Sequence, residues 1–136
     1  MRLIVCLDER GGMSFCGKRQ SRDSAVCEKI AALTAGSAVW MNAYSASLFK
    51  TVDMLISVDE VFLDKAGEKA YCFAENVDVS AYLEKAEELI VFYWNRHYPS
   101  DKKFPAVLPN DIWKRKEKTD FTGTSHEKIT MEVYCR

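Results

Sequence analysis

The sequence lacks the residue clusters of metal sites and the short motifs of common catalytic turns. Only two of its 136 residues are histidines, His97 and His126, and no two cysteines form a Cys-x-x-Cys pair. Zinc sites need several His, Cys or carboxylate ligands at close spacing, so we expect no metal centre and no zinc-dependent hydrolase. A glycine-rich phosphate loop and a Gly-x-Ser-x-Gly nucleophile turn are also absent, so neither of these motifs points to a phosphate site or to a hydrolase.

An excess of charge of one sign is missing too. The chain has 19 Lys and Arg against 20 Asp and Glu, for a net charge of −1. The net charge therefore gives no reason to expect binding to nucleic acid or to a membrane surface. The longest apolar run is far too short to cross a bilayer, and no signal-peptide pattern opens the sequence. We expect neither a membrane nor a nucleic-acid partner.

Five cysteines are an odd number, which does not suit a framework of disulfides. Cys6 and Cys27 lie inside apolar stretches, where a thiol usually acts as a small hydrophobic side chain. This usage is typical of a reducing compartment, so we expect a cytoplasmic protein.

The order of apolar patterns predicts an α/β fold. The hydrophobic share of 48% and the charged share of 29% are those of a soluble globular protein, and residues 1–136 are enough for one domain. We expect strands at residues 3–7, 38–41, 54–58, 71–74, 89–94 and 129–135, helices at 23–34, 46–50 and 78–86, a loop at 13–22 and a turn at 64–67. Early alternation of strands and helices, with two strands closing the chain, indicates a mostly parallel sheet flanked by helices, with an antiparallel C-terminal edge.

Two of these elements have a predicted buried side. Val26, Ile30 and Leu33 recur at helical spacing and should share one inward face. In the last strand, Ile129 to Cys135 alternates apolar and polar residues, which is the period of a half-buried strand.

A specific resemblance emerges near the C-terminus. An acidic turn, Asp101-Lys102-Lys103-Phe104-Pro105, is followed eight residues later by Trp113, and it lies between the apolar run 89–94 and the alternating final segment. In this order the segment resembles the last third of dihydrofolate reductases. Residues 3–49 resemble the first third without a gap, through Asp8, the Gly12-Met13 corner and the Gly17-Lys18 loop. The resemblance implies a dihydrofolate reductase-like fold, with a shortened middle.

The positions that carry the family's chemistry depart from its pattern. The catalytic carboxylate falls on Val26, the tryptophan before that helix on Ser21, and the active-site threonine on Phe92. The Gly-Arg-x-Thr turn that holds cofactor phosphate becomes residues 42–45, Asn-Ala-Tyr-Ser, where only the Ser45 hydroxyl survives as a phosphate contact. The Gly-Gly pair falls near Glu75, whose charge would repel a pyrophosphate. The cofactor stays unidentified, and NADPH is disfavoured.

Three functions stay open at this point. The leading one is a non-catalytic or repurposed member whose pocket binds a small planar or nucleotide-like ligand at the carboxyl ends of the parallel strands. The others are an NADPH-dependent reductase with a rearranged site and a protein-binding adaptor or inhibitor, and an exposed edge strand would also allow a homodimer. The expected ligand contacts are Cys6, Met13, Asp23, Val26, Ile30, Asn42, Tyr44, Ser45 and Phe92.

Three polar features need weighing against simpler roles. Asp23 is either a displaced acid or the N-cap of the first helix, and capping needs only local geometry. The basic run Lys18, Arg19 and Arg22 suits an anionic ligand or a solvated loop. Ser125, His126 and Glu127 are adjacent, whereas catalytic triads are assembled from separate parts of a fold, so we expect a turn with local bonds there.

Overall fold

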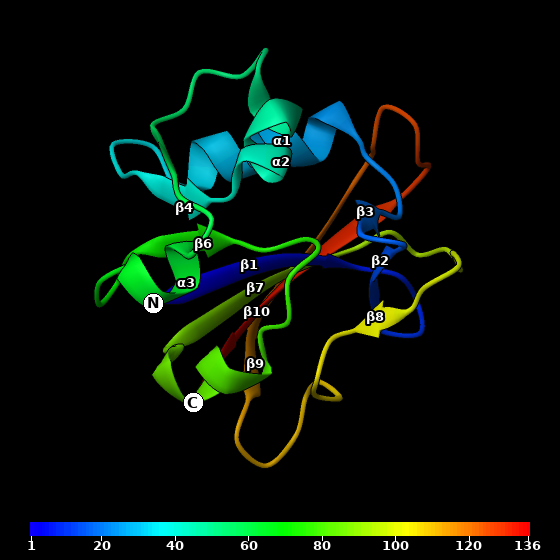
Figure 1. The fold of residues 1–136 in the computed structure, drawn as a ribbon. Helices are drawn as coiled ribbons and strands as arrows, with labels where there is room; N and C mark the ends of the chain where they lie inside the picture. Colours follow the sequence, from blue (N-terminus) through cyan, green and yellow to red (C-terminus); the bar gives the residue numbers. More distant parts are fainter.

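The computed structural model describes residues 1–136, and its centre is a seven-stranded sheet (Figure 1). The strand order is β5-β4-β6-β1-β7-β10-β9. The strands span Arg2–Leu7 (β1), Val39–Met41 (β4), Ile56–Val58 (β5), Tyr71–Phe73 (β6), Glu88–Tyr93 (β7), Lys114–Phe121 (β9) and Ile129–Cys135 (β10). The first five in the sheet are parallel, and β10 runs antiparallel to both β7 and β9. This confirms the predicted single-domain α/β fold with an antiparallel C-terminal edge.

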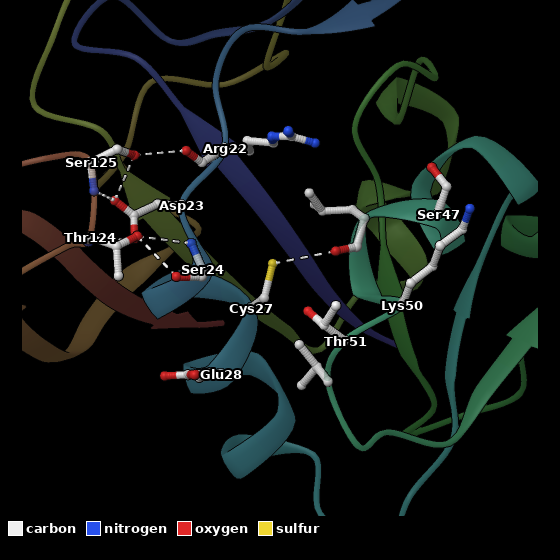
Figure 2. Close-up of a pocket in the computed structure, with 12 residues that line it drawn as sticks. Arg22, Asp23, Ser24, Cys27, Glu28, Ser47, Lys50, Thr51, Thr124 and Ser125 are labelled. Atoms are coloured by element: carbon white, nitrogen blue, oxygen red, sulfur yellow. Dashed lines mark hydrogen bonds between the residues drawn. The ribbon is translucent and has the colours of Figure 1, made fainter.

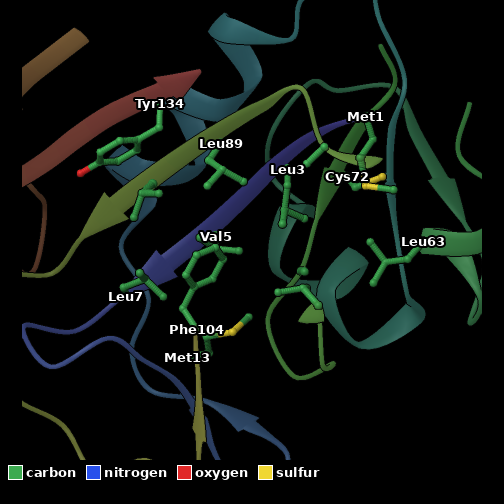
Figure 3. Close-up of a cluster of buried hydrophobic side chains, with 14 of the residues drawn as sticks. Met1, Leu3, Val5, Leu7, Met13, Leu63, Cys72, Leu89, Phe104 and Tyr134 are labelled. Atoms are coloured by element: carbon green, nitrogen blue, oxygen red, sulfur yellow. The ribbon is translucent and has the colours of Figure 1, made fainter. Parts of the chain in front are cut away.

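Both faces of the sheet are covered, which is why the central strands are continuously apolar. Along β1, Leu3 and Val5 enter one buried cluster, and Ile4 between them enters the other. Helix α1 (Ser24–Leu33) covers the face of Ile4 with Val26, Cys27 and Ile30. The opposite face (Figure 3) is closed by Leu63 of α3 (Phe62–Lys65) and by Phe104 and Trp113 from the C-terminal half.

Side-chain caps define where the helices begin. The Asp23 carboxylate accepts a hydrogen bond from the Ala25 backbone N–H at 2.9 Å, so Asp23 is the N-cap of α1, as the sequence predicts. Asn42 caps α2 (Ala43–Ala46) in the same way through the Ser45 N–H, and α2 continues as the 3₁₀ helix η1 (Ser47–Phe49). This helical segment therefore begins three residues earlier than predicted, because Asn42 supplies the cap.

Two predicted irregular segments are in fact ordered elements. Residues 13–22 contain β2 (Gly12–Phe15) and β3 (Lys18–Arg19), which form a second sheet with β8 (Lys102–Lys103). The loop prediction was wrong because β2 pairs with a strand far along the chain, which local sequence does not reveal. The predicted turn at 64–67 overlaps the short helix α3.

Three burial and helix predictions also need correction. Leu33 is 37% exposed, because it ends α1 and nothing covers it as Val26 and Ile30 are covered. The last strand is not half-buried: Glu132 and Tyr134 are buried along with the apolar residues between them, since β10 lies inside the sheet with both faces covered. The helix expected at 78–86 is the 3₁₀ helix η2 (Ser80–Lys85).

The two edges of the sheet differ in character. Strand β9 forms one edge, and its charged stretch Lys114–Lys118 is exposed along its whole length. At the other edge, Val58 of β5 is 54% exposed. No helix is both long enough and apolar enough to span a membrane.

The packing of η1 onto the sheet gives a direct test of the core. Phe49 is 2% exposed and meets Phe73 edge-to-face, with ring centroids 5.1 Å apart. We expect Phe49→Ala to lower the free energy of unfolding by about 3–5 kcal/mol in urea titrations, because it leaves a cavity in the core. Val107→Ala, at a side chain that is 84% exposed, should change it by less than about 0.5 kcal/mol. Equal effects of the two substitutions would contradict this packing.

Candidate functional site

The carboxyl end of β6 carries a buried acid that is bound by two other segments. Glu75 is 7% exposed and accepts two hydrogen bonds from the Arg19 guanidinium, Nε to Oε2 at 2.8 Å and Nη2 to Oε1 at 2.9 Å. The Ser45 hydroxyl donates to the same Oε1 at 2.8 Å. Burial lowers the pKa of Arg19, but Glu75 more than offsets it, so the net shift is upward. The result is a bidentate, partly buried ion pair beside α2.

Residues of the α2 turn complete this network. The Tyr44 hydroxyl accepts the Arg19 backbone N–H at 2.8 Å, and the Arg19 guanidinium lies over the Tyr44 ring at 4.3 Å from its centroid. Asn42 donates to the Asn76 side chain at 3.0 Å. The polar groups of the turn are therefore engaged within the protein, and the Ser45 hydroxyl is bonded to Glu75.

A second buried acid, Asp8, fixes the corner after β1. Its Oδ1 accepts the backbone N–H groups of Arg10 and Gly12, each at 2.8 Å. Its Oδ2 accepts the Gln20 side chain at 3.0 Å and the Tyr98 N–H at 3.2 Å. Burial raises the pKa of Asp8, and these hydrogen bonds outweigh it and lower the pKa overall. Gln20 therefore ties the segment before α1 to the end of β1.

The third buried acid, Asp23, binds the loop between β9 and β10. Its Oδ1 accepts the backbone N–H and the hydroxyl of Thr124, both at 2.8 Å, and its Oδ2 accepts the Ser125 N–H at 2.9 Å. Nδ1 of His126 lies 3.0 Å from Oδ2. Burial raises the pKa of the Asp23 carboxyl, but the bonds from Thr124, Ser125 and His126 hold it well below its usual range. A Cβ at Gly123 would collide with Oδ2, so this close approach needs glycine.

His126 extends the same cluster on its other side. Its Nε2 lies 3.2 Å from the Ser21 hydroxyl and 2.9 Å from the Tyr98 hydroxyl. The imidazole stacks on Trp94 with centroids 4.8 Å apart. The predicted turn exists, closed by a bond from the Gly123 N–H to the His126 carbonyl at 2.9 Å. The His126 side chain, however, binds Asp23, which lies 103 positions earlier in the sequence. The residues next to His126 in the sequence do not predict this contact.

The main cavity lies between α1, η1 and this loop (Figure 2). Its volume is about 490 Å³. Arg22 lines one wall and extends toward η1 in Figure 2, and Lys50 stands on the opposite wall. The other lining residues are Asp23, Ser24, Cys27, Glu28, Ser47, Leu48, Thr51, Val52, Thr124 and Ser125.

Of the nine predicted ligand contacts, only Asp23 lines this cavity. Val26, Ile30 and Phe92 are buried together on the α1 face of the sheet, with Cys6 packed against them. Met13 is buried in the cluster of the opposite face. Asn42, Tyr44 and Ser45 come together around the Arg19–Glu75 pair.

The cysteines near the site are protonated thiols at neutral pH. Burial, followed by the Glu75 charge, raises the pKa of Cys6 well above its ordinary value and that of Cys27 to about 11. Because the thiolate is the reactive form, neither residue is an activated nucleophile.

The comparisons with known proteins show the fold. No protein-family model matches the chain, and no curated protein matches it in sequence. Among solved structures it is similar to dihydrofolate reductase from Enterococcus faecalis complexed with NADP(H) and RAB-propyl. The TM-score is 0.68 at 11% sequence identity, over 99% of this chain and 95% of that one. The chain therefore has a dihydrofolate reductase-like fold, as its sequence patterns predict.

The Arg19–Glu75 pair can be tested by a double-mutant cycle in urea. We expect Glu75→Ala to cost about 3 kcal/mol, because it leaves the Arg19 guanidinium buried without its partner. Combining it with Arg19→Met should recover part of that loss, since no unpaired charge then stays behind. Purely additive effects of the two substitutions would contradict a direct interaction.

The Asp23 cluster predicts a pH-dependent stability. Its pKa is lower in the folded protein than the value of about 3.9 in an unfolded chain, so the unfolded state binds the proton first. Relative to Asp23→Asn, the wild type should be more stable by about 2–3 kcal/mol at pH 7. That gap should narrow as the pH falls below about 4.

Urea titrations from pH 7 to pH 2.5 measure this gap. The control is Asp111→Asn at an exposed position, which should stay within about 0.5 kcal/mol of the wild type throughout. A gap that is constant down to pH 2.5 would show that Asp23 has no depressed pKa.

Proposed function

We propose that this protein is a repurposed member of the dihydrofolate reductase fold that binds a small anionic, nucleotide-like ligand without NADPH-dependent reduction. The observation that carries the proposal is the Glu75 carboxylate, which accepts hydrogen bonds from Ser45 and Arg19 at the carboxyl end of β6. The resemblance puts cofactor phosphate at this position. The Glu75 carboxylate thus accepts the hydrogen bonds from Ser45 and Arg19 that a bound phosphate would need.

The residues present do not fit NADPH. A phosphate brought to the Ser45 hydroxyl would have to displace the Glu75 carboxylate, which this hydroxyl and the Arg19 guanidinium already bind. On α1, the position of the family's acid is Val26, which is 3% exposed and holds no proton. The reductase alternative would require both obstacles to be overcome.

The cavity between α1 and η1 supports an anionic ligand. Its volume of about 490 Å³ falls within the range of small-molecule sites. Arg22 and Lys50 supply positive charge from facing walls, and the walls also carry the hydroxyls of Ser24, Ser47 and Thr51. Guanidinium and ammonium groups with hydroxyls between them are the donors that a phosphate or carboxylate prefers.

A separate observation favours the protein-binding alternative. Near the β5 edge, Leu55, Val58 and Val61 are 60%, 54% and 51% exposed. Exposed apolar side chains that lie close together in sequence suit a protein contact. Under that alternative the cavity would have no ligand of its own.

Thermal unfolding with a ligand panel tests the proposal. The panel contains NADPH, NADP, folate, nucleoside mono- and triphosphates and inorganic phosphate. A nucleotide at a hundred times its dissociation constant should stabilise the protein by about 2.7 kcal/mol, which raises Tm by several degrees, whereas NADPH should give no shift.

Substitutions in the cavity wall and on a distant strand test whether the nucleotide binds in the cavity. Arg22→Gln combined with Lys50→Gln should abolish the nucleotide shift, because both substitutions remove charge from the cavity walls. Lys116→Gln on the exposed edge strand removes a charge far from the cavity in the fold and should leave the shift unchanged. A shift with NADPH would support the reductase alternative, and no shift with any compound would support the protein-binding one.

A further inference from the structure

Ser21, His126 and Asp23 form a continuous hydrogen-bonded chain. The Ser21 hydroxyl lies 3.2 Å from Nε2 of His126, and Nδ1 of the same ring lies 3.0 Å from Oδ2 of Asp23. The side chains of His126 and Asp23 are 3% and 0% exposed, whereas Ser21 is only half-buried. A half-buried serine is therefore backed by a buried imidazole and a buried carboxylate.

The network fixes where the protons lie. The Asp23 carboxylate is ionised and accepts hydrogen bonds only, so Nδ1 of His126 carries the proton between them. In the neutral ring, Nε2 then offers one lone pair, and the hydroxyls of Ser21 and Tyr98 both lie within hydrogen-bond distance of it. This is the tautomer a general base needs to take a proton from serine.

We propose that Ser21 is an activated nucleophile that hydrolyses small carboxylic esters, with His126 as its general base and Asp23 as the positioning residue. The three residues come from two segments about 100 positions apart, and Ser–His–Asp sites are recognised by such geometry rather than by sequence order. The inference goes beyond the proposed function and does not depend on binding of a nucleotide-like ligand in the cavity.

The surroundings of the chain suit this chemistry. Stacking on Trp94 and the bond to Asp23 hold the imidazole in one orientation. The backbone N–H groups of Arg22 and Asp23 follow the nucleophile directly and donate no hydrogen bond within the protein, so the proposal assigns the oxyanion to them. Both residues also line the cavity, whose wall begins one residue after Ser21 and does not include Ser21 itself.

The reaction would proceed in two balanced steps. The Ser21 Oγ attacks the ester carbonyl carbon while its proton moves to Nε2 of His126. The bond to the alcohol oxygen then breaks, and His126 returns the proton to the departing alkoxide. Water repeats the sequence on the acyl-serine, which releases the carboxylic acid and regenerates Ser21.

Tyr98 competes for the same lone pair, because its hydroxyl lies 2.9 Å from Nε2. When Tyr98 donates to Nε2, the Ser21 proton has no acceptor there. Removing this hydroxyl should therefore raise the reactivity of Ser21, a change that a merely structural role of the cluster does not predict.

The test uses a fluorophosphonate probe, which phosphonylates activated serines with loss of fluoride. Intact mass spectrometry of the full chain should show addition of one probe, and peptide mapping should locate it on Ser21. Tyr98→Phe should label faster than the wild type, and Ser21→Ala should not label. With p-nitrophenyl acetate, the same order of rates is expected for release of nitrophenol.

Matched variants separate activation from folding. Ser37→Ala removes an exposed hydroxyl beyond the C-terminal end of α1, the end opposite Asp23, and it should label as the wild type does. Truncating the buried His126 also costs stability, so Ser21→Ala and Tyr98→Phe, which keep the imidazole, carry the test. The proposal is overturned if Ser21 stays unmodified in the folded wild type, or if Ser21→Ala is labelled to the same extent.

Discussion

Three buried carboxylates hold one segment against the carboxyl edge of the sheet, and the arrangement of the whole site depends on them. Within residues 19–23, Arg19 is bound to Glu75 and Gln20 to Asp8, while Asp23 is bound to the loop that joins β9 and β10. Each acid is buried, and each reaches a different part of the fold. An unpaired buried charge costs several kcal/mol, so each of these interactions strongly favours one backbone conformation for residues 19–23.

The backbone conformation of residues 19–23 determines which cavities of the fold are filled and which stay open. At the ends of β4 and β6, the Arg19–Glu75 pair and the residues around it fill the crevice with side chains of the protein itself. Between α1 and η1 a cavity stays open, and most of its lining residues are polar or charged. The chain has a dihydrofolate reductase-like fold, and because one fold hosts many functions, this likeness does not determine its chemistry.

The sequence predicted the scaffold well because strands and helices leave local patterns. The apolar runs of β1 and β7 and the cap at Asp23 are visible in short stretches. The pairing of β2 with β8 left no such pattern, since it depends on segments far apart in the chain.

The site was harder to predict for the same reason. Adjacency suggested a local turn at His126, whereas its partners are Ser21, Asp23 and Tyr98. The sequence singled out Glu75 as a charge beside the expected phosphate position, but it did not reveal its partner Arg19. Strand β9, at the edge of the sheet, carries several lysines. A second copy of the protein that paired with this strand would bring lysines against lysines, so the sheet resists growing into fibres from this edge.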